Sequence, residues 1–143
     1  MKTMPLSLCA IAVVSLVSVC STFRASAHDA PGEETVRPVM QQDIPETPGK
    51  HVAMATVSYA PGQAAAPHKH PGSLFAYVLE GQVISQLEGQ PAKTYNVGDS
   101  WYEPPGAHHV VCRNASATQP AKLLVWAIVG ANEPIKQALP ASP

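Results

Sequence analysis

The chain has 143 residues, with nine basic and ten acidic side chains and no run of basic residues. Proteins bind nucleic acid mainly by neutralising phosphates with clustered lysine and arginine, so this balance argues against a nucleic-acid-binding protein. The length suits one globular domain better than two.

Residues 1–27 have the organisation of a secretory signal peptide. Lys2 is followed by an apolar run over residues 6–19, which is shorter than the roughly 20 residues that a membrane-spanning helix needs. Residues 25–27, Ala-Ser-Ala, supply the small-residue pattern that signal peptidase accepts. We therefore expect cleavage after residue 27 and a periplasmic or secreted protein without a stable membrane span. Two alternatives are a lipoprotein attached through Cys20 and an uncleaved N-terminal anchor.

Residues 28–50 are expected to form an extended N-terminal arm. They contain Pro31, Pro38, Pro45 and Pro48 and few apolar side chains, a composition typical of extended or partly ordered chain. Such an arm can lie along the edge of a sheet or against a partner subunit.

Residues 51–143 are predicted to form a single all-β domain. Short β-prone segments alternate with turns that contain glycine or proline, and the only helical signal is a weak turn at residues 133–139. Strands at spacings of about 8–12 residues are typical of a sandwich or a barrel. The predicted strands are residues 51–59, 74–79, 82–87, 93–97, 100–103, 108–113 and 121–129.

Three of the six histidines have the spacing of a metal site. His68 and His70 are two residues apart, so on a strand both rings lie on the same face. His109 begins a second strand after the Pro-Pro-Gly turn at residues 104–106, and its ring can face the same interior. Imidazole binds many transition metals, so we expect a divalent ion held by these three residues, with Fe, Zn, Mn, Ni and Cu left open.

The same residues resemble the two sequence motifs of the cupins. Residues 62–81 have the pattern G-x5-H-x-H and end at a glycine, and residues 98–109 have the pattern G-x5-P-P-G-x2-H. The resemblance implies a cupin-type double-stranded β-helix, or jelly-roll, barrel with a divalent metal ion inside. It also implies a homodimer, for which Phe75, Tyr77 and Trp126 are candidate apolar contacts.

One position departs from the cupin pattern. The first motif has a glutamate ligand where this chain has Leu74, and neither Leu74 nor Phe75 can bind a metal. The resemblance then implies three neutral ligands, as in the three-histidine cupins, which include some non-haem iron dioxygenases. An ion without a carboxylate ligand keeps its full charge, which strengthens its attraction for an anionic substrate and its Lewis acidity.

Glu103 and Tyr102 are the candidate catalytic residues. Glu103 precedes the turn at residues 104–106 and could act as an acid, as a base or as a replacement oxygen ligand, although a solvated carboxylate at the sheet edge is the simpler interpretation. Tyr102 could donate a hydrogen bond to a substrate, although a packing role is simpler. Cys112 is expected to be an inert packed thiol on the face opposite His109.

Three functions are compatible with these features. The first is a metal-dependent, dioxygenase-like oxidoreductase that acts on a small organic substrate. The second is a non-catalytic cupin that binds a metal or a small ligand. The third is a metal-dependent isomerase, lyase or decarboxylase in which the ion polarises a carbonyl or carboxylate group. The sequence therefore leaves open whether the protein is an enzyme.

Overall fold

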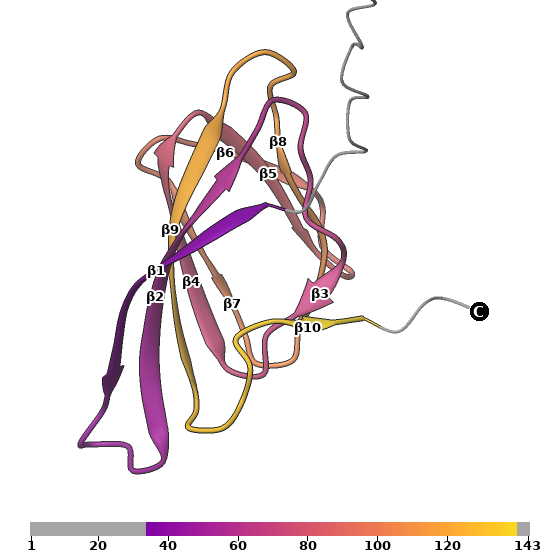
Figure 1. Cartoon of the computed structure of the whole chain (residues 1–143). Coiled ribbons are helices and arrows are strands. Elements are labelled where there is room, and N and C mark those ends of the chain that lie inside the picture. Colours follow the sequence, from indigo (N-terminus) through magenta and orange to yellow (C-terminus); the bar gives the residue numbers. More distant parts are fainter. Residues whose placement is uncertain (1–33, 140–143) are drawn as a thin grey trace, which may run out of the picture.

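The computed structural model describes residues 34–139, which form ten strands in two five-stranded antiparallel sheets. One sheet has the order β1-β2-β9-β4-β7 and the other β10-β3-β8-β5-β6, and the two sheets face each other across a common interior (Figure 1). The described part of the chain contains no helix, and so none that could span a membrane. The strands are β1 (Thr35–Asp43), β2 (Lys50–Tyr59), β3 (His68–Lys69), β4 (Ser73–Glu80), β5 (Gln82–Leu87), β6 (Lys93–Asn96), β7 (Ser100–Glu103), β8 (His108–Asn114), β9 (Ala121–Gly130) and β10 (Gln137–Ala138).

The all-β prediction is confirmed, and each of the seven predicted strands is present within one residue at either end. The agreement follows from turn chemistry, because glycines with positive φ lie at the predicted turns. Gly81 (φ 69°) joins β4 to β5, and Gly98 (φ 92°) precedes β7. These two turns set the lengths of the strands that carry the inward-facing side chains.

The strand β1 lies in the segment that was expected to be an arm. It pairs with β2 along the edge of the first sheet, and every residue of β1 is exposed. Pro38 lies beside an irregularity in the register, which suits an edge strand because proline has no N–H to donate. The predicted domain boundary at residue 51 therefore falls inside the sheet, and residues 28–33 lie outside the described part of the chain.

The weak helical turn predicted at residues 133–139 is wrong. Residues in this segment form β10, in which Gln137 pairs with Lys69 and Ala138 pairs with His68 of β3. The local sequence does not show this pairing, because the partner strand lies far away along the chain. The C-terminal segment consequently covers the strand that carries the first histidine.

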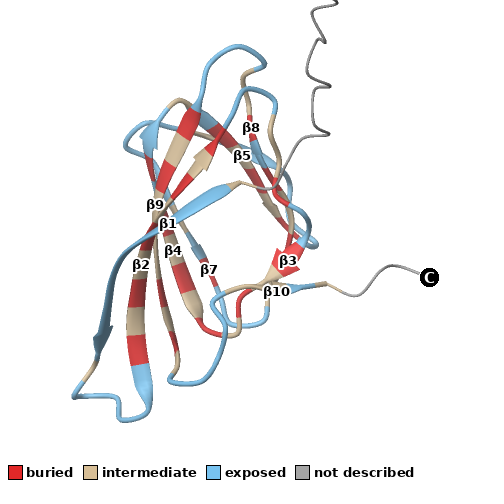
Figure 2. Cartoon of the chain, viewed as in Figure 1, coloured by how far each residue is buried: buried red, intermediate tan, exposed pale blue. Residues whose placement is uncertain are grey.

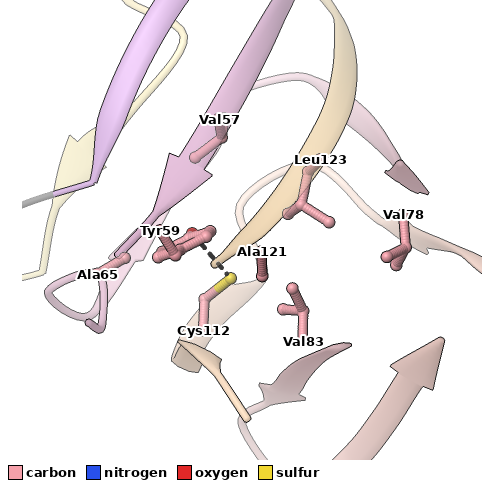
Figure 3. Packing of buried hydrophobic residues seen from close by; sticks show 8 residues of the cluster. All are labelled: Val57, Tyr59, Ala65, Val78, Val83, Cys112, Ala121 and Leu123. Atoms are coloured by element: carbon pink, nitrogen blue, oxygen red, sulfur yellow. Dashed lines mark hydrogen bonds between the residues drawn. The ribbon is translucent and has the colours of Figure 1, made fainter. Parts of the chain in front are cut away.

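The core consists of the inward-facing residues of both sheets. Alternate residues of β2 and β9 are buried, as the banding of these strands shows (Figure 2). One cluster packs Val78 and Val83, both fully buried, with Leu123 and other residues (Figure 3). Burying aliphatic side chains of this size contributes roughly 1.5–3 kcal/mol each to folding. This packing holds the strands on which the histidines lie.

Candidate metal centre

His68 and His70 present one free ring nitrogen each. The Nδ1 of His68 lies 2.7 Å from the carbonyl oxygen of Ala66, and the Nδ1 of His70 lies 2.6 Å from that of Ile135. A carbonyl oxygen can only accept, so each Nδ1 carries the proton and each Nε2 keeps its lone pair. Both side chains are buried, at 6% exposure each. The backbone thus fixes both rings in the tautomer that a metal ligand requires.

His109 joins them from the neighbouring strand. It pairs directly with His68 in the β3–β8 register, is 2% exposed, and has its Nε2 2.8 Å from the Ser85 hydroxyl oxygen. The turn before β8 is tied to the first pair of histidines, because the Gly106 N–H donates to the carbonyl oxygen of His70 at 2.7 Å. One ring nitrogen from each of His68, His70 and His109 lies within 4.8 Å of the others. The structure therefore brings together the three histidines that the spacing singled out.

Glu103 is buried beside the histidines, at 1% exposure, so the interpretation as a solvated edge carboxylate is wrong. Its Oε1 accepts a hydrogen bond from the Trp101 indole N–H at 2.9 Å and lies 3.1 Å from Nδ1 of His109. Its Oε2 lies 3.7 Å from Nε2 of His70. Glu103 ends β7 on the inward face, where strand alternation places it among buried side chains.

Tyr102 lies on the opposite face of the same strand. It is 47% exposed, its hydroxyl lies 3.2 Å from Ser73 Oγ, and its ring packs against Phe75 with the centroids 5.0 Å apart. Phe75 in turn stacks on Trp126, at 5.5 Å between centroids. Adjacent residues of a strand point to opposite faces, so Glu103 and Tyr102 cannot both reach the interior. The structure does not bring Tyr102 to the histidines.

Cys112 lies on the same buried face as His109, so the expected opposite placement is wrong. The register between β5 and β8 shifts at Gln86 and Leu87, and this irregularity adds a residue to β8 between His109 and Cys112. The Cys112 sulfur lies 3.1 Å from the Tyr59 hydroxyl, and both side chains are buried (Figure 3). No pattern in the sequence indicates this contact, because a bulge cannot be recognised from alternation alone.

The pKa values of the three buried groups differ because their neighbours differ. Burial lowers the pKa of His68 to about 4. Burial also acts to lower the pKa of His109, but Cys112 and Glu103 outweigh it and raise that pKa to about 10. Burial acts to raise the pKa of Glu103, yet the nearby His109 imidazole and the hydrogen bond from Trp101 hold that pKa below its usual range. His68 is therefore neutral at pH 7 and Glu103 is ionised.

The histidines lie on the wall of a cavity of about 140 Å³. Most of its lining is apolar and comes from β2, β4 and β9, with Leu74 among these residues. Glu34 and Lys136 line it as well, joined by an ion pair of 2.6 Å between Oε1 and Nζ. The sequence did not single out these two residues, because they lie 102 positions apart and only the fold brings them together.

The donor set fits a divalent transition metal ion. Two imidazoles are fixed with a free Nε2. Within the described residues three buried side-chain atoms have no hydrogen-bond partner: His109 Nδ1 and Glu103 Oε2 beside the imidazoles, and Glu34 Oε2 in the ion pair with Lys136. Unpartnered buried polar atoms are uncommon and call for a partner such as an ion. The other two described histidines lie apart from this group: His108 pairs with Glu88 at 2.8 Å on the surface, and His51 is buried within β2.

Comparison with solved structures identifies this barrel architecture. The DMSP lyase DddQ from Ruegeria pomeroyi DSS-3 is 22% identical with a TM-score of 0.60, over 74% of this chain and 51% of that one. TT1209 from Thermus thermophilus is 32% identical with a TM-score of 0.55, over 68% of this chain and 85% of that one. Oxalate oxidase in complex with glycolate is 24% identical with a TM-score of 0.53, over 71% of this chain and 57% of that one.

This chain thus spans only about half the length of DddQ. No curated protein matches it. The Cupin domain family matches residues 55–127, which run from β2 into β9. The matched range includes all three histidines and both predicted motifs. Two facing antiparallel sheets enclose these histidines, as the resemblance of the motifs implied. The chain belongs to the cupin family.

Proposed function

We propose that His68, His70 and His109 bind a divalent transition metal ion and that the protein is a dioxygenase-like oxidoreductase for a small organic substrate. The observation that carries the proposal is the convergence of three buried imidazoles, two of them fixed by backbone carbonyls with Nε2 free. An ion held by few protein ligands keeps open positions, where it would place O₂ beside a substrate.

The cavity supports a small and partly apolar substrate. Its volume of about 140 Å³ suits a small organic molecule, and its walls are mostly aliphatic. Apolar walls exclude water from a reacting centre, which strengthens every electrostatic interaction there. Lys136 also lines the cavity, but its charge is offset by Glu34, which pairs with it at 2.6 Å.

Metal analysis combined with oxygen uptake tests this function. Protein purified from its native compartment is expected to contain about one metal ion per chain and to consume O₂ with a small diketone or phenolic substrate. His108→Ala is the matched control, because His108 is on the surface and pairs with Glu88. Absence of stoichiometric metal from protein prepared without chelators would contradict the metal site.

A metal-dependent lyase, isomerase or decarboxylase is the second candidate. Glu103 favours it, because a buried carboxylate 3.7 Å from His70 is placed to accept a proton from a substrate at the same site. Structural neighbours described as a DMSP lyase and as oxalate oxidase share the fold. Product formation from a small carboxylate without O₂ uptake would favour this candidate. Stoichiometric metal without turnover on either substrate class would favour the non-catalytic binding protein.

We also propose export and a homodimer. Export follows from the signal-peptide pattern of residues 1–27 and is tested by N-terminal sequencing of the periplasmic or secreted protein, which is expected to begin at His28. The dimer contact is proposed on the outer face of the first sheet, where Phe75 stacks on Trp126 and Tyr77 is 39% exposed. Sedimentation of the wild type and of Tyr77→Lys should then show a dimer and a monomer; two monomers would contradict the dimer.

A further inference from the structure

Glu103 and Leu74 are neighbours across the two strands β4 and β7. Their Cα atoms are paired in the register, and both side chains are buried, Leu74 at 3% exposure and Glu103 at 1%. Directly paired residues on one face of antiparallel strands have Cβ atoms about 4.5–5.5 Å apart, so their side chains share the same space. A carboxylate on β7 therefore reaches the volume that a longer polar side chain at Leu74 would reach.

The distances around Glu103 suit ligands of one ion. Two ligand atoms that each lie about 2.1 Å from an ion are about 3.0–3.6 Å from each other. The range corresponds to ligand–metal–ligand angles from the octahedral to the trigonal value. Glu103 Oε1 lies 3.1 Å from His109 Nδ1, and Glu103 Oε2 lies 3.7 Å from His70 Nε2. The Oε1–His109 distance falls within this range, and the Oε2–His70 distance lies just above it, so the carboxylate stands beside two of the three imidazoles and a small movement of its side chain would bring both oxygens to ligand spacing.

Hydrogen bonding around the carboxylate leaves one oxygen without a partner. Trp101 donates its indole N–H to Oε1, whereas Oε2 is buried and has no hydrogen-bond partner among residues 34–139. The Nδ1 of His109 is also buried and unpartnered, although Oε1 is near it. A buried carboxylate oxygen without a partner is destabilising, and a bound cation between these atoms would remove the penalty. Trp101 therefore fixes Oε1 and leaves Oε2 facing Nε2 of His70.

We infer that Glu103 is a fourth ligand, supplied by β7 in place of the side chain at Leu74 on β4. The inference rests on the proposed metal site. A carboxylate ligand lowers the net charge of an occupied site by one, so the centre has three neutral ligands and one anion. Cross-strand pairing would then preserve the ligand set although the carboxylate lies 29 residues further along the chain than Leu74.

The test uses the whole exported protein, stripped with a chelator and titrated with Co²⁺ alone. Dissociation constants come from competition with a chromophoric chelator, and the ligand field comes from the visible absorption of bound Co²⁺. We expect Glu103→Gln to weaken Co²⁺ binding at least tenfold and to shift the absorption bands. The matched control is Glu80→Gln, which removes an exposed carboxylate near the end of β4 and should change neither quantity.

A double variant separates loss of a ligand from loss of folding. Leu74→Glu combined with Glu103→Leu moves the carboxylate back to β4, and its Co²⁺ affinity should return to within a few-fold of the wild type. Circular dichroism in chelator checks that each variant is folded. Wild-type absorption bands in Glu103→Gln would overturn the inference while leaving the three-histidine site intact. A double variant that binds no better than folded Glu103→Gln would also overturn it. Failure of the wild type to bind Co²⁺ would instead refute the proposed metal site.

Discussion

At the scale of single residues, two backbone carbonyls prepare the histidine cluster. Ala66 and Ile135 each accept from a histidine Nδ1, which leaves the two Nε2 lone pairs available without rearrangement. The carbonyl of Ile135 belongs to a segment 65 residues away from His70. The cluster is therefore held in place by the fold and does not need the ion to position its rings.

Removal of two ligands should reveal the contribution of the metal to stability. We expect His68→Ala with His109→Ala to lower the melting temperature in metal-replete buffer by several degrees more than in chelator, because only the replete wild type gains ligand-linked stability. Thermal melts followed by circular dichroism measure both differences. His108→Ala is the control and should give equal, small shifts. Equal large shifts for the double variant in both buffers would indicate a purely structural role.

The stability of the metal-free protein should fall on acidification. His68 has a pKa of about 4 in the fold and about 6.5 in the unfolded chain, so between these values the unfolded state binds more protons. Stability from this group is present above pH 6.5 and is lost as the pH falls toward 4, by roughly 3 kcal/mol in all. Urea denaturation in chelator at each pH measures the loss. His68→Asn should flatten this acid limb, and an unchanged limb would contradict the assignment.

His109 should produce the opposite dependence on the alkaline side. Its pKa of about 10 in the fold exceeds the unfolded value of about 6.5, so the folded state binds more protons between them. Stability from this group is present below pH 6.5 and is lost as the pH rises toward 10. Metal-free protein is therefore expected to be most stable near pH 6.5. The same urea series, extended upward with His109→Asn as control, checks this limb.

At the scale of the strands, periodicity and turn residues predicted the positions of the strands, because these depend mainly on local sequence. The strand 121–129 was recognised from its apolar residues, and the histidine spacing predicted the convergence of three rings. The face of Cys112 was missed, because a bulge in β8 breaks the alternation. The burial of Glu103 was also missed, because in a four-residue strand the inward face is set by pairing with Leu74 and not by the local pattern.

Pairing between distant segments accounts for the remaining differences. The strand β1 lies in a proline-containing segment whose extended conformation is stabilised by β2, and β10 is a two-residue strand stabilised by β3. Neither has enough apolar residues to indicate a strand by itself. Those two strands bring Glu34 and Lys136 near the cavity, so the sequence could not predict that part of its lining.

Gly72 sets the close approach of β4 to β9 immediately after the first histidine pair. A Cβ atom there would lie 1.8 Å from the carbonyl oxygen of Ile128, and a backbone atom cannot move aside without parting the strands. We expect Gly72→Ala to lower the free energy of unfolding by about 3 kcal/mol or more. Gly89→Ala is the control, since its Cβ would meet open space and only its positive φ costs about 1–2 kcal/mol. Similar losses by chemical denaturation in both variants would contradict this role.

At the scale of the whole molecule, the two ends of the described chain meet beside the cavity. Lys136, next to β10, and Glu34, next to β1, form an ion pair in which Glu34 is nearly buried, at 6% side-chain exposure. Burial of part of this pair gives it a larger interaction energy than a surface pair has. The pair thus joins the two sheets, since β1 belongs to the first sheet and β10 to the second (strands in Figure 1).

Opening of this ion pair should control how fast the site fills. In stopped-flow experiments, we expect Co²⁺ uptake by stripped wild-type protein to become modestly faster as salt rises from about 0.05 M to about 0.5 M, because Lys136 is partly exposed and salt weakens such a partly buried pair only in part. Glu34→Gln with Lys136→Gln should take up Co²⁺ faster at low salt and show little salt dependence. Equal rates for the two proteins at every salt concentration would contradict this expectation.

The ion pair between Glu34 and Lys136 would therefore affect the residence time of a bound ion separately from its dissociation constant. An equilibrium titration measures only the dissociation constant. On the proposed site, the three histidines would determine how tightly an ion is held, whereas the predicted effect of the Glu34–Lys136 contact is on how long an ion or a product stays before it leaves. Two variants with the same dissociation constant can then differ in residence time, since both rate constants change by the same factor. Exchange of a bound ion with the surroundings would then be governed by Glu34 and Lys136, which lie outside residues 62–109, the part of the sequence that carries the cupin motifs.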